Sequence, residues 1–140
     1  MIKIDSSDLN KFSVMLGELP DEIKNDVRKV VKNSAFNIER NAKSSVSVKT
    51  GHLRRSISTK IGDMEATIHT SNVKYAVIVE KGSKAHVIRP KNKKALYWKG
   101  ASHPVKQVNH PGSKAKPYLI PAFEKEKDQF LEKLKEVIRW

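Results

Sequence analysis

Apolar residues recur with helical spacing in the first part of the chain. Between Leu9 and Leu19 they stand three or four positions apart, behind Ser6 and Asp8 as potential N-caps. Pro20 should end this helix and begin the next, because proline disrupts the interior of a helix but suits its first turn.

A second, longer helix is predicted from Pro20 to about Asn41. The acidic residues Asp21 and Glu22 would lie favourably at the positive end of its dipole. Its charged residues fall mostly opposite a continuous apolar stripe, which indicates an amphipathic helix packed on a core. The stripe consists of Ile23, Val27, Val30, Val31, Ala35, Ile38 and Ala42.

Helical spacing returns in the last segment, "PYLIPAFEKEKDQFLEKLKEVIRW", which starts at Pro117. Its apolar residues again share one side, while both signs of charge are mixed on the other. Such a face is typical of a helix packed on its own protein and not of one lying on a membrane. The apolar residues are Phe123, Phe130, Leu131, Leu134 and Ile138.

The middle of the chain has strand-like patterns. In "LRRSISTKI" (53–61), alternate residues would face inward, as in a half-buried strand. Two further strands are predicted in "EATIHTS" (65–71) and "YAVIVEKGS" (75–83), after a turn at Gly62 and Asp63. The three would form an antiparallel meander.

Regular patterns fade between residues 83 and 116. Proline and glycine interrupt this stretch repeatedly, and only "HVIR", "ALYW" and "VKQV" remain as short strand candidates. A loop of this length is uncommon in a compact domain unless it carries a function. We therefore predict a long functional excursion from the sheet.

These patterns predict one α+β domain over residues 1–140. It would be helical at 1–46, form antiparallel strands at 50–82, continue as a basic loop with short strands at 83–116 and end in a C-terminal helix at 117–140. A chain of 140 residues buries one core. The long N-terminal helix and the C-terminal helix would pack on a small antiparallel sheet or half-barrel.

Positive charge is concentrated in the predicted loop. The chain carries a net charge of +13, and the stretch from Lys81 to Phe123 holds 10 basic residues and no acidic one. Such a stretch suits a polyanion or an acidic protein surface, and its aromatic pair could stack on bases. The candidate contact residues are Lys84, Arg89, Lys91, Lys93, Lys94, Tyr97, Trp98 and Lys99.

Neither base-specific recognition nor catalysis has a motif in this sequence. No RNA-recognition signature, GxxG clamp, zinc-finger spacing or clear helix-turn-helix occurs, so only non-specific contact with nucleic acid is favoured. No nucleophile, general base and orienting acid stand at the spacing of a catalytic motif, and no glycine-rich phosphate-binding loop is found. We therefore predict that the chain is not an enzyme, and a small basic ribonuclease is the weakest alternative.

No metal, cofactor or membrane partner is expected. The 5 histidines are widely spaced, and the chain has no cysteine. The longest apolar runs, such as "YAVIV", are far shorter than the roughly 18 residues that cross a bilayer. The start has no apolar core typical of a secretory signal. These features favour a soluble protein.

Three stretches, taken in order, resemble one family of tailed-phage proteins. They are "TGHLRRSI" (50–57), "YAVIVEKGS" (75–83) and a longer segment that begins "HVIRPKNKKALYW" (86–98) and closes "HPGSKAKPYLIPAFE" (110–124). In order and spacing they are similar to the family of the gene-ten product of the lambdoid phage HK-ninety-seven, a tail component or head-tail joining protein. The departures are small, such as serine for threonine at Ser83 and Ser113.

The resemblance implies a structural protein of the virion neck or tail, assembled in the host cytoplasm. Such a protein forms a ring, of six copies in the family, and joins the DNA-filled head to the tail. Its partners would be copies of itself and the connector and tail-terminator proteins. A chain that is monomeric in solution and orders its loop on assembly would fit the modest apolar content of 38%.

Two kinds of partner fit the basic loop. The loop could face acidic surfaces of adjacent rings or DNA in the channel, and we favour the protein surfaces because no base-reading motif occurs. The alternative function is a non-specific nucleic-acid-binding protein.

The shared motifs also predict turns and one ion pair. Glu80 is the one acid between Glu65 and Glu124, so it is expected to pair with Arg54 or Arg55 on a neighbouring strand, or else to be an exposed edge residue. Glycine permits sharp changes of chain direction, and proline rigidifies them. The predicted turn residues are Gly51, Gly82, Pro111 and Gly112.

Overall fold

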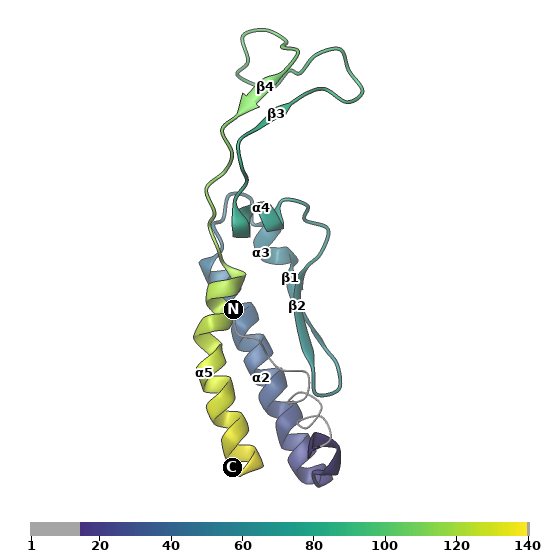
Figure 1. Ribbon diagram of the computed structural model, residues 1–140, viewed down its shortest axis with the longest axis vertical. Helices are drawn as coiled ribbons and strands as arrows, with labels where there is room; N and C mark the ends of the chain where they lie inside the picture. Colours follow the sequence, from purple (N-terminus) through teal and green to yellow (C-terminus); the bar gives the residue numbers. More distant parts are fainter. Residues whose placement is uncertain (1–14, 140) are drawn as a thin grey trace.

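The computed structural model describes residues 15–139. We call residues 15–82 and 118–139 the body, from which residues 83–117 project as a two-stranded arm (Figure 1). The first predicted helix falls mostly outside the described residues, and of its positions 15–18 are helical. Long helices combine with small antiparallel sheets, so the predicted α+β class is confirmed.

The body is built around two long helices that lie side by side (Figure 1). Helix α2 spans Asp21–Ser45, and helix α5 spans Leu119–Ile138. Helix α2 begins after Pro20 and carries Asp21 and Glu22 in its first turn, as the sequence predicts. Its apolar stripe faces the interior, where the buried members are Val27, Ala35, Ile38 and Ala42.

Helix α2 also contacts a β-hairpin. Strand β1 (Ile57–Ile61) pairs antiparallel with strand β2 (Ala66–Thr70) in continuous register. The guanidinium of Arg28 in α2 donates to the carboxylate of Asp63 in the hairpin turn, at 2.5 Å. No further strand joins this sheet among residues 15–139. Of the predicted three-stranded meander or half-barrel, only this two-stranded hairpin is present in that range.

A cluster of buried side chains holds the body together. It combines the C-terminal half of α2, the start of the hairpin and the first turn of α5. Ala42 and Ile57 are fully buried, which places the centre of the core between α2 and β1. The cluster consists of Ile38, Ala42, Val46, Leu53, Ile57, Val73, Ala76, Tyr118 and Ala122.

The strand predicted for residues 53–61 is wrong in its first half. Residues His52–Ser56 form a short helix, α3, before β1 begins at Ile57. Gly51 precedes this helix with φ of 75°, a left-handed conformation that favours glycine. Leu53 and Ile57 are four residues apart, which fits a helical turn as well as an alternating strand, and both are buried.

The strand predicted for residues 75–83 is also wrong. Residues Ala76–Lys81 form helix α4, which ends at Gly82. Ala76 and Val79, three residues apart, both contact the core. β-branched residues favour strands chiefly where a neighbouring strand can pack beside them, and this segment has none among residues 15–139.

The arm is a largely irregular loop with short paired segments. Strand β3 (His86–Ile88) and strand β4 (Val108–His110) run antiparallel. The "HVIR" prediction is therefore confirmed, whereas "ALYW" gives one bridge residue and "VKQV" gives one bridge residue and the first residue of β4. The isolated bridges join Ser83 with Ser113 and Leu96 with Val105.

Two glycines let the two segments of the arm meet at its base. Gly82 and Gly112 have φ of 74° and 92°. A Cβ on Gly82 would lie 2.6 Å from the carbonyl oxygen of Ser113, and one on Gly112 would overlap the carbonyl oxygen of Ser83. Ser83 and Ser113 can thereby exchange backbone hydrogen bonds of 2.9 and 3.0 Å. Pro111 and Gly112 thus form a point of close approach and not the tight turn predicted.

Replacing Gly82 by alanine should open the base of the arm. Its methyl group would meet backbone atoms, which adds about 1–3 kcal/mol to the cost of a positive φ. The control is Gly100→Ala, at φ of 101° with no neighbour within 4 Å. Hydrogen exchange of the Ser83 and Ser113 amides measures the opening, and equal protection in the two variants would contradict the close approach.

Candidate functional site

The contact residues predicted from the sequence all lie exposed on the arm. No side chain between residues 83 and 117 is buried. No arm cation forms an ion pair within the described part of the chain. A segment without buried side chains gains little hydrophobic stabilisation to offset the entropy of ordering it. The eight residues are Lys84, Arg89, Lys91, Lys93, Lys94, Tyr97, Trp98 and Lys99.

The end of the arm, residues 91–104, presents two aromatic side chains, and we call it the tip. Tyr97 is 69% exposed and Trp98 is 49% exposed. Lysines flank this pair in the sequence and are themselves exposed. An aromatic pair among cations can stack on bases or enter an apolar hollow bordered by carboxylates.

Two histidines stack in the middle of the arm. The rings of His86 and His110 are 5.0 Å apart at an interplanar angle of 30°. The N–H of Gly112 donates to Nδ1 of His110 at 3.0 Å, so this nitrogen carries no proton. The pair supports the pairing of β3 with β4. Within residues 15–139, no group of three or more side chains that could hold a metal occurs.

One carboxylate ties helix α4 to the first turn of α5. Glu80 accepts hydrogen bonds from the backbone N–H groups of Tyr118, Leu119 and Ile120 at 2.9, 3.0 and 2.9 Å. Burial opposes its ionisation, but these donors outweigh burial and lower the pKa of Glu80. Burial, and then the charge of Glu80, raise the pKa of Tyr118. The two ends of the arm are thereby fixed to each other.

The ion pair predicted between Glu80 and Arg54 or Arg55 is not formed. The prediction assumed neighbouring strands, whereas Glu80 lies on α4 and both arginines lie on α3. Both arginines are exposed, and among residues 15–139 neither has a carboxylate within 4.0 Å. The sequence gives no distance between α4 and α5, so it could not match this acid to the start of a helix almost 40 residues later.

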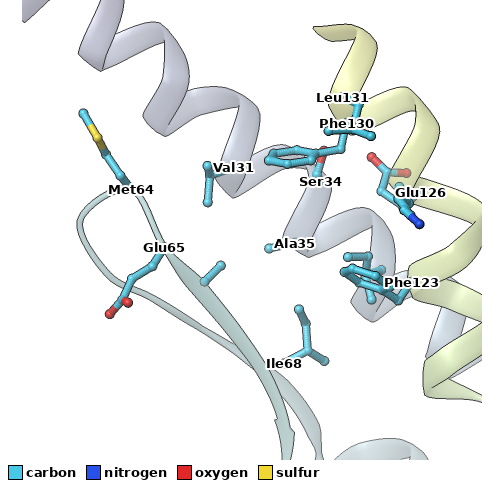
Figure 2. Close-up of a pocket in the computed structure, with 13 residues that line it drawn as sticks. Val31, Ser34, Ala35, Met64, Glu65, Ile68, Phe123, Glu126, Phe130 and Leu131 are labelled. Atoms are coloured by element: carbon cyan, nitrogen blue, oxygen red, sulfur yellow. The ribbon is translucent and has the colours of Figure 1, made fainter. Parts of the chain in front are cut away.

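An open apolar groove runs between β2 and α5, with α2 as its floor (Figure 2). It consists of two adjoining hollows of about 470 and 400 Å³, and we call it the α5 groove. Phe123 lines both hollows and is 51% exposed. The main apolar residues of the groove are Val31, Ala35, Ile38, Ile68, Phe123 and Phe130.

The α5 groove also contains buried polar atoms. Ser34 and Glu126 are each 4% exposed, and both line it. Glu126 accepts a hydrogen bond from Asn37 at 3.1 Å, whereas Oγ of Ser34 has no partner among the described residues. An unpaired buried hydroxyl is uncommon, so Ser34 is an unused hydrogen-bonding group in the floor of the groove. Sequence reasoning missed the groove because its residues come from three elements and resemble ordinary core positions.

Comparison with known families gives one match. A family model described as "Bacteriophage HK97-gp10, putative tail-component" matches residues 10–82. The matched segment covers α2, α3, the hairpin and α4, and it ends where the arm begins. No curated protein and no solved structure matches the chain. In the part of the chain that the structure describes, no helix is long and apolar enough to cross a membrane.

Proposed function

Because the chain belongs to the HK97-gp10 family of phage tail components, we propose that it completes the tail at its junction with the head. In this function it forms a ring around the DNA channel, with the six copies that the family resemblance implies. The arm carries the proposal, since residues 83–117 include no buried side chain. Such a segment can bury its exposed side chains when neighbouring proteins bind to it.

The body supports the same proposal. Large apolar side chains remain exposed on α2, α4 and α5, and apolar patches of this kind mark interaction surfaces. A ring component must bury surface against two copies and against the proteins above and below it. The exposed residues include Phe36, Val77, Ile78, Ile120, Phe123 and Leu131. These exposed residues support a structural role in the particle.

Acidic protein surfaces are the favoured partners of the arm. Its cations have no carboxylate partner within the described residues, so they are available to a complementary surface. Neighbouring copies of the chain, or the connector and tail-terminator proteins that flank the junction, would supply such surfaces. Tyr97 and Trp98 would add apolar anchors at the tip.

The alternative function is non-specific binding of nucleic acid, which rests on the same positive charge. The affinity for DNA at different salt concentrations distinguishes the two functions. If proteins are the partners, duplex DNA should bind only weakly at physiological salt, with a Kd of about 100 μM or more, at the weak end of the non-specific range or beyond it. Filter binding across a salt series measures this affinity. Micromolar or tighter binding with a steep salt dependence would support the alternative.

The position of the chain in phage particles tests the proposed function. Immunogold labelling with an antibody against the purified chain should mark the junction between head and tail in electron micrographs. Particles whose label is confined to the head shell or to the distal tail would contradict the proposal, as would particles that lack the protein.

A further inference from the structure

We infer that the α5 groove receives the tip of the arm of a neighbouring copy, which links copies head to tail. The inference rests on the proposed function as a ring component and names the contact by which the ring would form. It combines two surfaces of one chain, the open groove of the body and the uncovered aromatic tip of the arm.

The groove determines the chemistry of its occupant. Its surface is largely apolar, so the occupant needs an apolar body. The lining also includes the unpaired hydroxyl of Ser34 and the carboxylate of Glu126, which lie beside Phe130 in Figure 2. An occupant that carries an N–H or O–H at the edge of an aromatic ring satisfies both requirements.

The tip supplies this chemistry. The indole N–H of Trp98 is a donor, and the hydroxyl of Tyr97 is both a donor and an acceptor. Both rings are largely exposed, Trp98 to about half, so their insertion into a groove would remove a large apolar area from water. Aromatic side chains of this kind are the usual anchors of protein interfaces.

Charge favours the arm over other occupants. Three carboxylates, those of Glu65, Glu124 and Glu126, line the two hollows beside one cation, Lys127. The stretch from Lys81 to Phe123 carries 10 cations and no acid. The two surfaces are therefore complementary, whereas nucleic acid or an anionic membrane would be repelled by the carboxylates of the groove.

The contact must join different copies. The arm leaves the body beyond α4, and its tip lies far from the space between the hairpin and α5 (Figure 1). Each copy therefore offers a tip to one neighbour and a groove to the other. Such a heterologous contact produces a ring when its rotation closes, and an open filament when it does not.

Cysteine cross-linking tests the contact, because the chain has no cysteine of its own. Lys99→Cys places a thiol beside Trp98, and Lys127→Cys places one in the groove lining. Mixed under mild oxidation, these copies should form disulfide-linked heterodimers at least about tenfold faster than Lys99→Cys copies mixed with the control Lys29→Cys. Lys29 lies on the exposed surface of α2, outside the groove.

Two further variants sharpen the test. Adding Trp98→Ala to the Lys99→Cys copy should return the rate to that of the control, because the anchor is lost. Glu65→Cys provides a second position in the groove if Lys127→Cys folds poorly. A chain with Lys99→Cys and Lys127→Cys together should give a ladder of linked oligomers, whereas an isologous contact would stop at dimers.

The outcomes separate this inference from the proposed function. Equal rates with the groove and control cysteines would overturn the inference. If gold label still marks the junction in that case, the proposed function stands and the arm has a different partner. If label is absent from the junction, the proposed function fails whatever the cross-linking rates.

Discussion

Deletion of residues 91–99 should leave a folded chain that no longer joins heads to tails. No side chain in this segment is buried, and its backbone contacts are the bridge between Leu96 and Val105 and a hydrogen bond from the N–H of Ala101 to the carbonyl of Trp98. The melting temperature should therefore change little, as for most surface changes. Loss of two aromatic anchors worth about 2 kcal/mol each should lower the yield of joined particles by roughly a hundredfold or more.

Two controls assign the loss to side chains. Replacement of residues 91–99 by a glycine-serine linker of equal length keeps the reach of the arm but removes its chemistry, and it should fail like the deletion. A variant with glutamine at Lys91, Lys93, Lys94 and Lys99 keeps Tyr97 and Trp98 and should retain part of the activity. Normal particle yield from the deletion would show that the tip has no role in joining.

Glu80→Ala should strongly destabilise the attachment of the arm to the body. It removes the acceptor of three backbone N–H groups at the start of α5. Loss of a charged helix cap with several donors costs about 2–3 kcal/mol. For a domain of this size, that corresponds to a fall of roughly 5–10 °C in melting temperature. Thermal unfolding followed by circular dichroism measures it.

The matched variant Glu80→Gln removes the charge of this side chain but keeps its size and an oxygen that can accept hydrogen bonds. Because the pKa of Glu80 is lowered in the fold, its ionised form stabilises the protein above the ordinary carboxyl pKa. This stability is lost as the pH falls through the lowered pKa. The stability difference between the native chain and Glu80→Gln should therefore be full at pH 7 and shrink below about pH 4. A difference that does not vary with pH would contradict the role of the charge.

The sequence predicted the two long helices well because their apolar stripes are long. In α2 the stripe from Val27 to Ala42 repeats over several turns, and in α5 the stripe that begins at Phe123 does the same. When apolar residues repeat over several turns, only the helical period fits their spacing. The hairpin strand β2 was predicted for the related reason that alternation persists from Ala66 to Thr70.

Short segments were predicted less well, because a few residues fit two periods. Leu53 and Ile57 satisfy both a strand and a helical turn, and the run from Tyr75 to Val79 has strand propensity without a strand to pair with. In both cases burial in the shared core determines the outcome. Local preference gives way to tertiary packing in such segments.

The candidate site was predictable in its chemistry and not in its geometry. The sequence alone locates the acid-free stretch and its aromatic pair, because charge and residue type need no coordinates. The helix cap at Glu80 and the α5 groove depend on contacts between segments far apart in the chain. Such contacts leave no local periodicity, so only the folded structure reveals them.

The joining reaction itself tests the central claim most directly. Phage lacking this chain should accumulate DNA-filled heads and separate tails, which can be purified and mixed. Adding the purified native chain should restore joined, infectious particles in proportion to the amount added, and the 91–99 deletion variant should restore few. Joined particles forming equally well without the chain would contradict the claim that it completes the junction.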